Sequence, residues 1–351
     1  MAFALSSRSF SNEPSPAGSA SKRRPSRVLI ILAFAAVYLI WGSTYLAIKY
    51  AIGTLPPFLM AGIRFLSAGA ILFAWGSIRG ERSDTKARTS ITQWRRAFIT
   101  GALLLLCGNG GVTWAERYLP SGLTALLVAT EPLWVVMLNW AIAGRRGSAR
   151  PNAKVLVGLF IGLAGVAVLV SGGLNGGSGN AAMRWIGAGA VIAAGLSWAG
   201  GSVYSIRRTI QASALLASGM QMLAGGALLI AVGLVTGEYR KLDFNQASWL
   251  SIGALFYLIV FGSIVAFTAY SWLLRTVSPA RAATYAYVNP VVAVLLGWFI
   301  AREPVTVRTL LAAIVIVASV ALITTYGREV TKESGAHSSL SDEDHRQLRI
   351  Y

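Results

Sequence analysis

The sequence predicts an all-α, polytopic membrane protein with ten transmembrane helices arranged as two inverted five-helix repeats. Three observations carry this prediction: an apolar composition, ten long apolar stretches, and an internal similarity at a nearly constant offset. Of the 351 residues, 55% are hydrophobic and 13% are charged. Soluble domains carry about 25% charged residues, so this chain is typical of a protein whose surface faces lipid.

The ten apolar stretches are each close to the roughly 20 residues that a helix needs to cross a bilayer. Residues 1–27 and 327–351 are polar, and we expect a disordered cytoplasmic arm and tail there. The first apolar stretch is longer than the core of a secretory signal, and similar stretches follow it. The predicted spans are 28–49, 58–78, 96–115, 122–143, 154–172, 184–205, 214–236, 249–273, 281–301 and 305–325.

The positions of Lys and Arg predict the orientation, because these residues are retained on the cytoplasmic side. With the N-terminus in the cytoplasm, 23 of the 31 Lys and Arg fall in cytoplasmic segments and seven in outside loops. The remaining one, Arg64, lies within a span. An even number of spans then places both termini in the cytoplasm.

The two halves of the chain, 28–172 and 184–325, resemble each other residue by residue. Trp41 and Trp198 are 157 residues apart, as are Gly69 and Gly226, whereas Pro132 and Pro290 are 158 apart. Because each half has five spans, the second half enters the membrane from the opposite side. Inverted repeats are typical of secondary transporters, whose substrate site lies near the midplane between the repeats.

Several other classes of function find no support in the residues. The net charge of +18 is spread over short gaps between apolar stretches, so we expect no nucleic-acid partner. The chain has no G-x-x-x-x-G-K-[ST] sequence, so we expect no ATP. Cys107 is the single cysteine, and His337 and His345 lie in the tail. We therefore expect no metal, no cofactor and no enzyme site.

Arg64 and Glu131 are the only opposite charges placed deep in the predicted spans. An ionisable group in hydrocarbon costs at least a few kcal/mol, which favours a functional role. Arg64 would attract an anionic or carbonyl group of a substrate, and Glu131 would bind a cation or exchange a coupling proton. The alternative is a permanent salt bridge that holds two helices together.

Asn109, Thr113 and Glu116 fall on one face of the third span. Asn109 is central and is a candidate for substrate binding, although an amide can equally hold helices together. Glu116 is near the outer end, where we expect it to be solvated.

Aromatic residues supply a second set of candidates for substrate binding. Trp41, Thr44 and Tyr45 share one face of the first span, and Trp198 is the repeat partner of Trp41. These rings could line a cavity for cationic or amphiphilic solutes, or they could serve ordinary packing.

Two prolines occupy matching positions in the repeats. Tyr285 and Asn289 precede Pro290 in the ninth span and are further candidates for substrate binding, while Glu131 precedes Pro132 in the fourth. A proline within a span bends the helix, so Pro132 and Pro290 are either gate hinges or fixed kinks.

Several motifs resemble the EamA family of the drug/metabolite transporter superfamily, and in particular its YedA-type exporters. The resemblance covers residues 28 to 325, and its motifs are Ile40-Trp41-Gly42-Ser43-Thr44-Tyr45, Met60-Ala61-Gly62-x-Arg64-Phe65, Gly108-Asn109-Gly110, and the stretch from Val277 to Gly297.

The resemblance implies a bacterial inner-membrane exporter of small metabolites, amino acids or drugs that works by alternating access. We expect a monomer or homodimer. The family does not uniformly carry an acid at the position of Glu131, so a coupling role there is a hypothesis about this chain. Some relatives in the superfamily are flippases for lipid-linked sugars, which remains an alternative. A membrane-embedded enzyme is a further alternative, but the residues it would need are missing.

Overall fold

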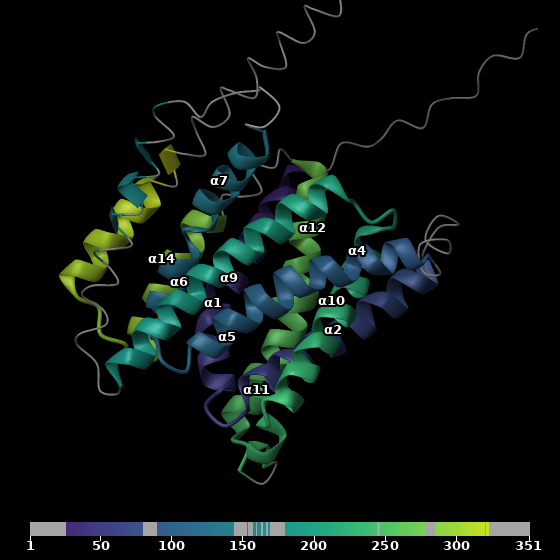
Figure 1. Cartoon of the computed structure of the whole chain (residues 1–351), viewed down its shortest axis with the longest axis horizontal. Helices are drawn as coiled ribbons and strands as arrows, with labels where there is room; N and C mark the ends of the chain where they lie inside the picture. The colour runs from purple at the N-terminus through teal and green to yellow at the C-terminus, as the bar shows by residue number, and fades with distance from the viewer. Residues whose placement is uncertain are drawn as a thin grey trace, which may run out of the picture.

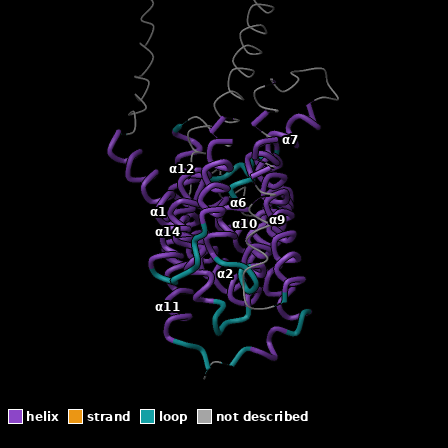
Figure 2. Tube along the Cα trace, turned by 90° about the vertical axis from the view of Figure 1, so that its left-hand side faces the viewer, coloured by secondary structure: helices purple, strands orange, loops and turns teal. Residues whose placement is uncertain are grey.

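The computed structural model describes residues 26–79, 90–143, 180–243, 246–277, 285–319 and 321–322, together with scattered positions between 153 and 168. These residues form helices joined by short connections, and none of them is in a strand. The helices gather into one elongated bundle (Figures 1 and 2).

The first half of the bundle contains α1, α2 and a long third helix that changes its winding. This third helix runs through α4, the π-helix η1 and α5 without a break. The bounds are α1 Arg27–Ala51, α2 Pro57–Arg79, α4 Ile91–Gly101, η1 Ala102–Gly110, α5 Gly111–Ala115, α6 Ser121–Val128 and α7 Glu131–Ala143.

The second half repeats this order, with a second π-helix, η4, in the equivalent long helix. Ser213 and Ser248 cap two of its helices, because their side chains accept backbone N–H groups of the first turn. The bounds are α9 Ala181–Arg207, α10 Ala214–Val235, the 3₁₀-helix η3 Glu238–Lys241, α11 Trp249–Tyr257, η4 Leu258–Val265, α12 Ala266–Thr276 and α14 Tyr285–Phe299, followed by an apolar helix Val307–Ser319.

Six described helices are long and apolar enough to cross a membrane, and they correspond to the first three predicted spans and to the sixth, seventh and eighth. Shorter apolar helices occupy the fourth, ninth and tenth spans. Most of the predicted span 154–172, the arm up to residue 25 and the tail from 323 lie outside the described residues.

The fourth predicted span, 122–143, is divided into α6 and α7, in keeping with the expected bend at Pro132. Residues 129 and 130 form a turn between α6 and α7. Pro132 explains the break, because it has no N–H to donate and its ring clashes with the carbonyl four residues earlier. Pro132 therefore sits in the first turn of α7, where proline is tolerated, whereas Pro290 lies inside α14.

Helix contacts between the two halves come in matching pairs. α1 packs against α14, and α9, which holds the same place in the second half, packs against α7. α1 also packs against η4 and α12, and α9 packs against η1 and α5. The pair formed by α2 and α10 is its own counterpart, so exchanging the halves leaves this pattern unchanged.

Glycines at seven-residue intervals bring α2 and α10 into close contact. They are Gly62, Gly69 and Gly76 on α2, and Gly219, Gly226 and Gly233 on α10. A Cβ atom at Gly69 would lie 2.8 Å from the backbone nitrogen of Leu223, and one at Gly226 would lie 2.8 Å from that of Leu66. Small residues of this kind let backbones approach where the hydrophobic effect cannot drive association.

One end of the bundle collects four loops, 52–56, 116–120, 236–243 with 246–248, and 300–306, which we call the four-loop end. Two glutamates join the halves there. Glu238 accepts the N–H groups of Phe58 and Leu59 at the start of α2, at 2.9 and 3.1 Å. Glu303 accepts the N–H groups of Ser121 and Gly122 at the start of α6, at 2.8 and 3.1 Å. Burial raises the pKa of Glu238. Both carboxylates lie at the N-terminus of a helix, where the helix dipole stabilises a negative charge.

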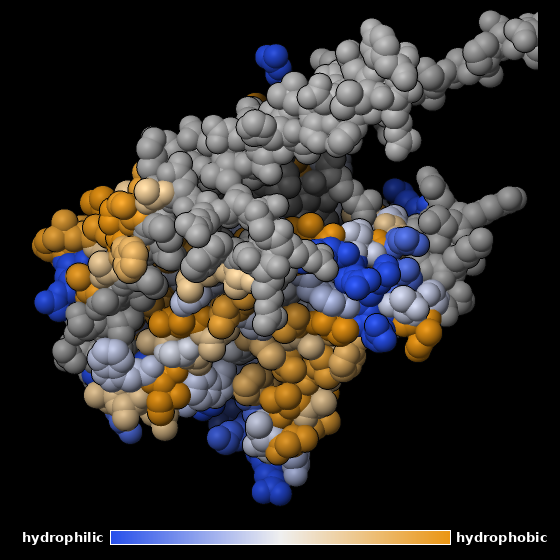
Figure 3. All heavy atoms as spheres, turned by 45° about the horizontal axis from the view of Figure 1, so that its top comes forward, coloured by the Kyte–Doolittle hydropathy of each residue, from blue (hydrophilic) through white to orange (hydrophobic). Residues whose placement is uncertain are grey.

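The flanks of the bundle carry many exposed apolar side chains, as expected for helices that face lipid. Examples with more than half of their surface exposed are Leu39, Val235, Trp249, Phe256 and Phe299. Figure 3 shows apolar side chains over much of one face and hydrophilic ones gathered at a few places near its edges.

The glycine contacts between α2 and α10 predict strong sensitivity to one added methyl group. We expect Gly69→Ala and Gly226→Ala each to cost about 1–3 kcal/mol of stability, because the neighbouring backbone must move. Thermal unfolding of purified protein, followed by size-exclusion chromatography, measures the effect. Gly189→Ala on α9 is the control, since nothing lies within 4 Å of its added Cβ. Equal unfolding temperatures for all three variants would contradict the prediction.

Candidate functional site

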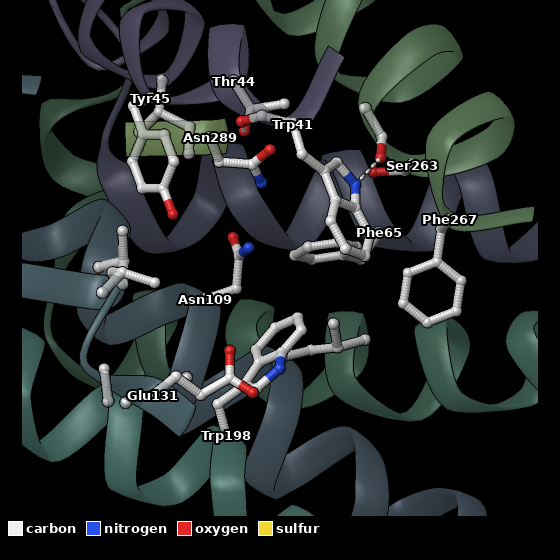
Figure 4. A pocket seen from close by; sticks show the side chains of 18 of the residues that line it. Trp41, Thr44, Tyr45, Phe65, Asn109, Glu131, Trp198, Ser263, Phe267 and Asn289 are labelled. Atoms are coloured by element: carbon white, nitrogen blue, oxygen red, sulfur yellow. Dashed lines mark hydrogen bonds between the residues drawn. The ribbon is translucent and has the colours of Figure 1, made fainter. Parts of the chain in front are cut away.

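A central cavity lies where helices of both halves meet. It contains every candidate that the sequence suggested for substrate binding, together with Glu131, and Figure 4 shows most of these side chains around one space. The predicted candidates in its lining are Trp41, Thr44, Tyr45, Arg64, Asn109, Glu131, Trp198, Tyr285 and Asn289; the others include Phe65, Gly108, Val112, Gly262, Ser263 and Phe267.

Arg64 enters the cavity from α2 with an incomplete set of partners. Its side chain is only 4% exposed, and its Nε donates to Ser263 Oγ at 2.8 Å. The guanidinium lies over the ring of Phe65, 4.7 Å from the ring centre. Its Nη1 has no hydrogen-bond partner within the described part of the chain. Arg64 therefore keeps donors available to a ligand.

Glu131 enters the cavity from the start of α7. It is 9% exposed, and its Oε2 accepts a hydrogen bond from the Tyr285 hydroxyl at 3.3 Å. Among the described residues Glu131 forms no ion pair with Arg64, whose Nε binds Ser263 instead. The alternative of a permanent salt bridge between the two charges is therefore wrong for this conformation, because each has a neutral partner from the second half.

Aromatic rings form one wall of the cavity around Trp41. Its ring centre lies 4.9 Å from that of Tyr270, 5.2 Å from that of Tyr285 and 6.4 Å from that of Phe267. Trp198 lies across the space from Trp41 (Figure 4). The two repeat-related tryptophans thus face the cavity from opposite sides, and this arrangement suits an apolar or cationic group between them.

The two π-helices were not predicted from the sequence, and both border the cavity. η1 contributes Gly108 and Asn109, and η4 contributes Gly262 and Ser263. A π-helix widens the turn and frees carbonyl groups, and such segments are frequent at functional sites. Here the Gly262 carbonyl accepts a hydrogen bond from Trp41 Nε1 at 3.2 Å. Glycine in each segment was the only sequence signal.

Polar groups in and beside the lining differ in whether they have hydrogen-bond partners. The Thr44 hydroxyl donates to the Trp41 carbonyl at 2.6 Å, so it is occupied within α1. The Thr113 hydroxyl donates to Asn109 Oδ1 at 3.5 Å. Asn289 Oδ1 is buried and has no hydrogen-bond partner among the described residues. A buried acceptor without a partner is costly, so Asn289 is a place where a ligand donor would be stabilised.

Glu116 contradicts the expectation that it is solvated. Its exposed fraction is 0%, because α5 ends inside the bundle and Lys49 of α1 covers that end. The Lys49 ammonium donates to the carbonyls of Glu116 and Leu119 at 2.8 and 3.0 Å.

A second cavity adjoins the central one and extends to the end of the bundle opposite the four-loop end. Trp198 and Phe267 line both spaces. The second cavity is also lined by Arg208, Thr209 and Ile210 of the loop between α9 and α10, and by Gln221, the repeat partner of Arg64. A continuous lining therefore connects the centre of the bundle to this loop.

Two segments of the chain, 28–171 and 185–325, match the sequence profile of the EamA-like transporter family. The chain belongs to this family. It is 41% identical over 290 residues to the uncharacterized inner membrane transporter YedA of Escherichia coli (strain K12), covering 82% of this chain and 88% of the relative. The expected resemblance to YedA is thus confirmed.

More distant relatives extend the comparison. The uncharacterized transporter YvbV of Bacillus subtilis (strain 168) is 25% identical, covering 85% of this chain and 92% of its own. A protein of known crystal structure matches with a TM-score of 0.59 at 23% identity, over 87% of this chain and 99% of that one. This last likeness supports the fold alone. Together with the apolar helices, the family makes the chain a multi-pass membrane transporter.

The unpaired donor of Arg64 predicts a conflict between stability and function. Arg64→Met keeps a long side chain and removes a buried charge, so we expect an unfolding temperature equal to or above that of the parent protein. Thermal unfolding in detergent tests this expectation. Ser263→Ala is the control, because it removes the hydroxyl that Arg64 uses and leaves the charge buried. A large loss of stability in Arg64→Met would show that the residue mainly holds the fold.

Proposed function

We propose that this transporter is a secondary exporter of small organic solutes, of the class of metabolites, amino acids or drugs. It works by alternating access, without ATP, and Glu131 couples export to protons. The observation that carries the proposal is the central cavity between the two halves. A buried acid and several aromatic residues meet there with a buried arginine, one of whose donors has no partner among the described residues.

The chemistry of the lining suits a solute with both polar and apolar parts. The free Nη1 of Arg64 fits a carboxylate or a carbonyl oxygen. The carboxyl group of Glu131 and Oδ1 of Asn289 fit a cationic or N–H-bearing group. Trp41 and Trp198, on opposite sides, fit an apolar or aromatic portion of the solute.

An inverted repeat would give such a site its mechanism. We propose that residues 28–172 and 184–325 are two five-helix repeats of opposite orientation, ten spans in all, with Pro132 and Pro290 as hinges. Support comes from the matched helix contacts, from the equivalent positions of η1 and η4, and from the two separate family matches. Exchanging the conformations of two such halves would open the cavity first to one side and then to the other.

We further propose that both termini are cytoplasmic in a bacterial inner membrane. The four-loop end then faces outward, and the second cavity faces the cytoplasm. The conformation described here would be the inward-facing one, since Glu238 and Glu303 join the halves at the outer end.

Reconstituted flux tests the proposed function. Purified protein in liposomes is given a panel of amino acids, small metabolites and cationic drugs, with and without a proton gradient. We expect saturable flux of at least one small solute, stimulated by the gradient. Arg64→Met should reduce this flux at least tenfold, and Glu131→Gln should abolish the stimulation by the gradient.

The same panel decides between the alternatives. Movement of a fluorescent lipid-linked sugar, with no flux of any soluble solute, would favour a flippase. Unchanged flux in Arg64→Met and Glu131→Gln at normal protein levels would remove both residues from the mechanism. Leu234→Ala is the matched control, since this exposed α10 side chain does not line the cavity.

The proposed orientation makes a prediction of its own. In a Cys107→Ala background the chain has no other cysteine. We expect Lys241→Cys to react with a membrane-impermeant thiol reagent added outside intact cells, and Arg208→Cys to react only in inside-out vesicles. The reverse labelling pattern would show that the topology is opposite to the one proposed.

A further inference from the structure

Glu116 is a buried acid that the central cavity does not use. It follows α5 directly and lies one helical turn beyond Val112, which lines the cavity. Its residue carbonyl binds Lys49, whose neighbour Ile48 also lines the cavity. Glu116 therefore lies at the start of loop 116–120, on the side of the four-loop end that adjoins the central cavity.

The carboxyl group of Glu116 receives no hydrogen bond from the described residues that would stabilise a negative charge. The residue is 0% exposed, and neither Oε1 nor Oε2 has a hydrogen-bond partner among the described residues. The nearby cation, Lys49, directs its ammonium to two backbone carbonyls instead. A buried carboxylate without hydrogen bonds is costly, and taking up a proton removes most of this cost. In this conformation the neutral, protonated acid is the favoured form.

Charges around Glu116 come from three elements. The titratable groups close enough to interact electrostatically with Glu116 are Lys49 and Tyr45 of α1, Arg64 of α2, and Glu303 of the loop after α14. Lys49 and Arg64 favour the charged form of Glu116, whereas Glu303 and burial oppose it. Glu303 in turn is held by the N-terminus of α6.

We propose that Glu116 is a proton-binding site, distinct from Glu131, whose occupation closes the four-loop end. The proposal rests on the alternating access of the proposed function. When that end opens, water reaches the carboxyl group and solvates its charged form. In the closed state this solvation is absent. Because the closed state then binds the proton more tightly than the open one, linkage requires low pH to favour closure and high pH to favour opening.

Two measurements that need no substrate test the proposal on the full chain in lipid. Infrared difference spectra between low and high pH report the C=O stretch of a protonated carboxylic acid. Spin labels at Thr54→Cys and Arg308→Cys, both exposed and at the four-loop end, report its opening by electron–electron distance measurement in the Cys107→Ala background. We expect an acid band at low pH, and a longer distance population that appears as the pH rises.

The variant Glu116→Gln imitates the protonated acid. We expect it to lose the Glu116 band and to keep the short distance at every pH. Asp243→Asn is the control, an exposed acid at the same end of the bundle that does not line the central cavity, and it should keep the change of distance with pH. A pH response in Glu116→Gln equal to that of the parent, or an acid band that survives the substitution unchanged, would overturn the proposal.

A second variant keeps the test decisive if Glu116→Gln does not fold. Lys49→Met removes the nearest positive charge, so the midpoint of the distance change should move upward by about one pH unit or more. No movement would also overturn the proposal. If the distance changes with pH through Glu116 but the liposome panel yields no flux, the proposed function fails and the proton site stands.

Discussion

The close packing of α2 against α10 is the constraint on which the remaining structure depends. Hydrocarbon supplies no hydrophobic drive between helices, so van der Waals contact must hold the halves together. Six glycines at seven-residue intervals supply it by removing the side chains that would separate the backbones. Arg64, two residues after Gly62, is thereby carried into the middle of the bundle. The helices of each half then pack against the other half around this pair, and the cavity is the space that they leave.

The cavity differs from the interface between α2 and α10 in how many of its polar groups have hydrogen-bond partners. The α2–α10 interface is closely packed. In the cavity, by contrast, Arg64 Nη1 and Asn289 Oδ1 have no hydrogen-bond partner among the described residues. Buried polar groups without hydrogen bonds reduce stability, and they persist at sites where a ligand supplies the missing bond. The two π-helices add to this character, because η1 and η4 open their turns beside the same space.

The two ends of the bundle are closed to different degrees. Glu238, Glu303 and Lys49 tie helix termini together at the four-loop end, each through backbone groups that a helix leaves unpaired. The opposite end has the second cavity, which continues the lining from Trp198 to Arg208. A chain with matched halves thus has an asymmetric conformation, and this asymmetry is what alternating access requires.

The sequence by itself determined the class of fold, the family, most of the spans and nine of the residues that line the central cavity. Apolar length and repeat register decide these, because lipid permits few exceptions to a continuous apolar helix. Only the tertiary structure decided which groups pair. It separated Arg64 from Glu131 and buried Glu116. These outcomes depend on which side chains from distant helices arrive at the same place, and local periodicity carries no record of that. The π-winding of η1 and η4 belongs with them, since the only signal for it in the sequence is a glycine in each segment.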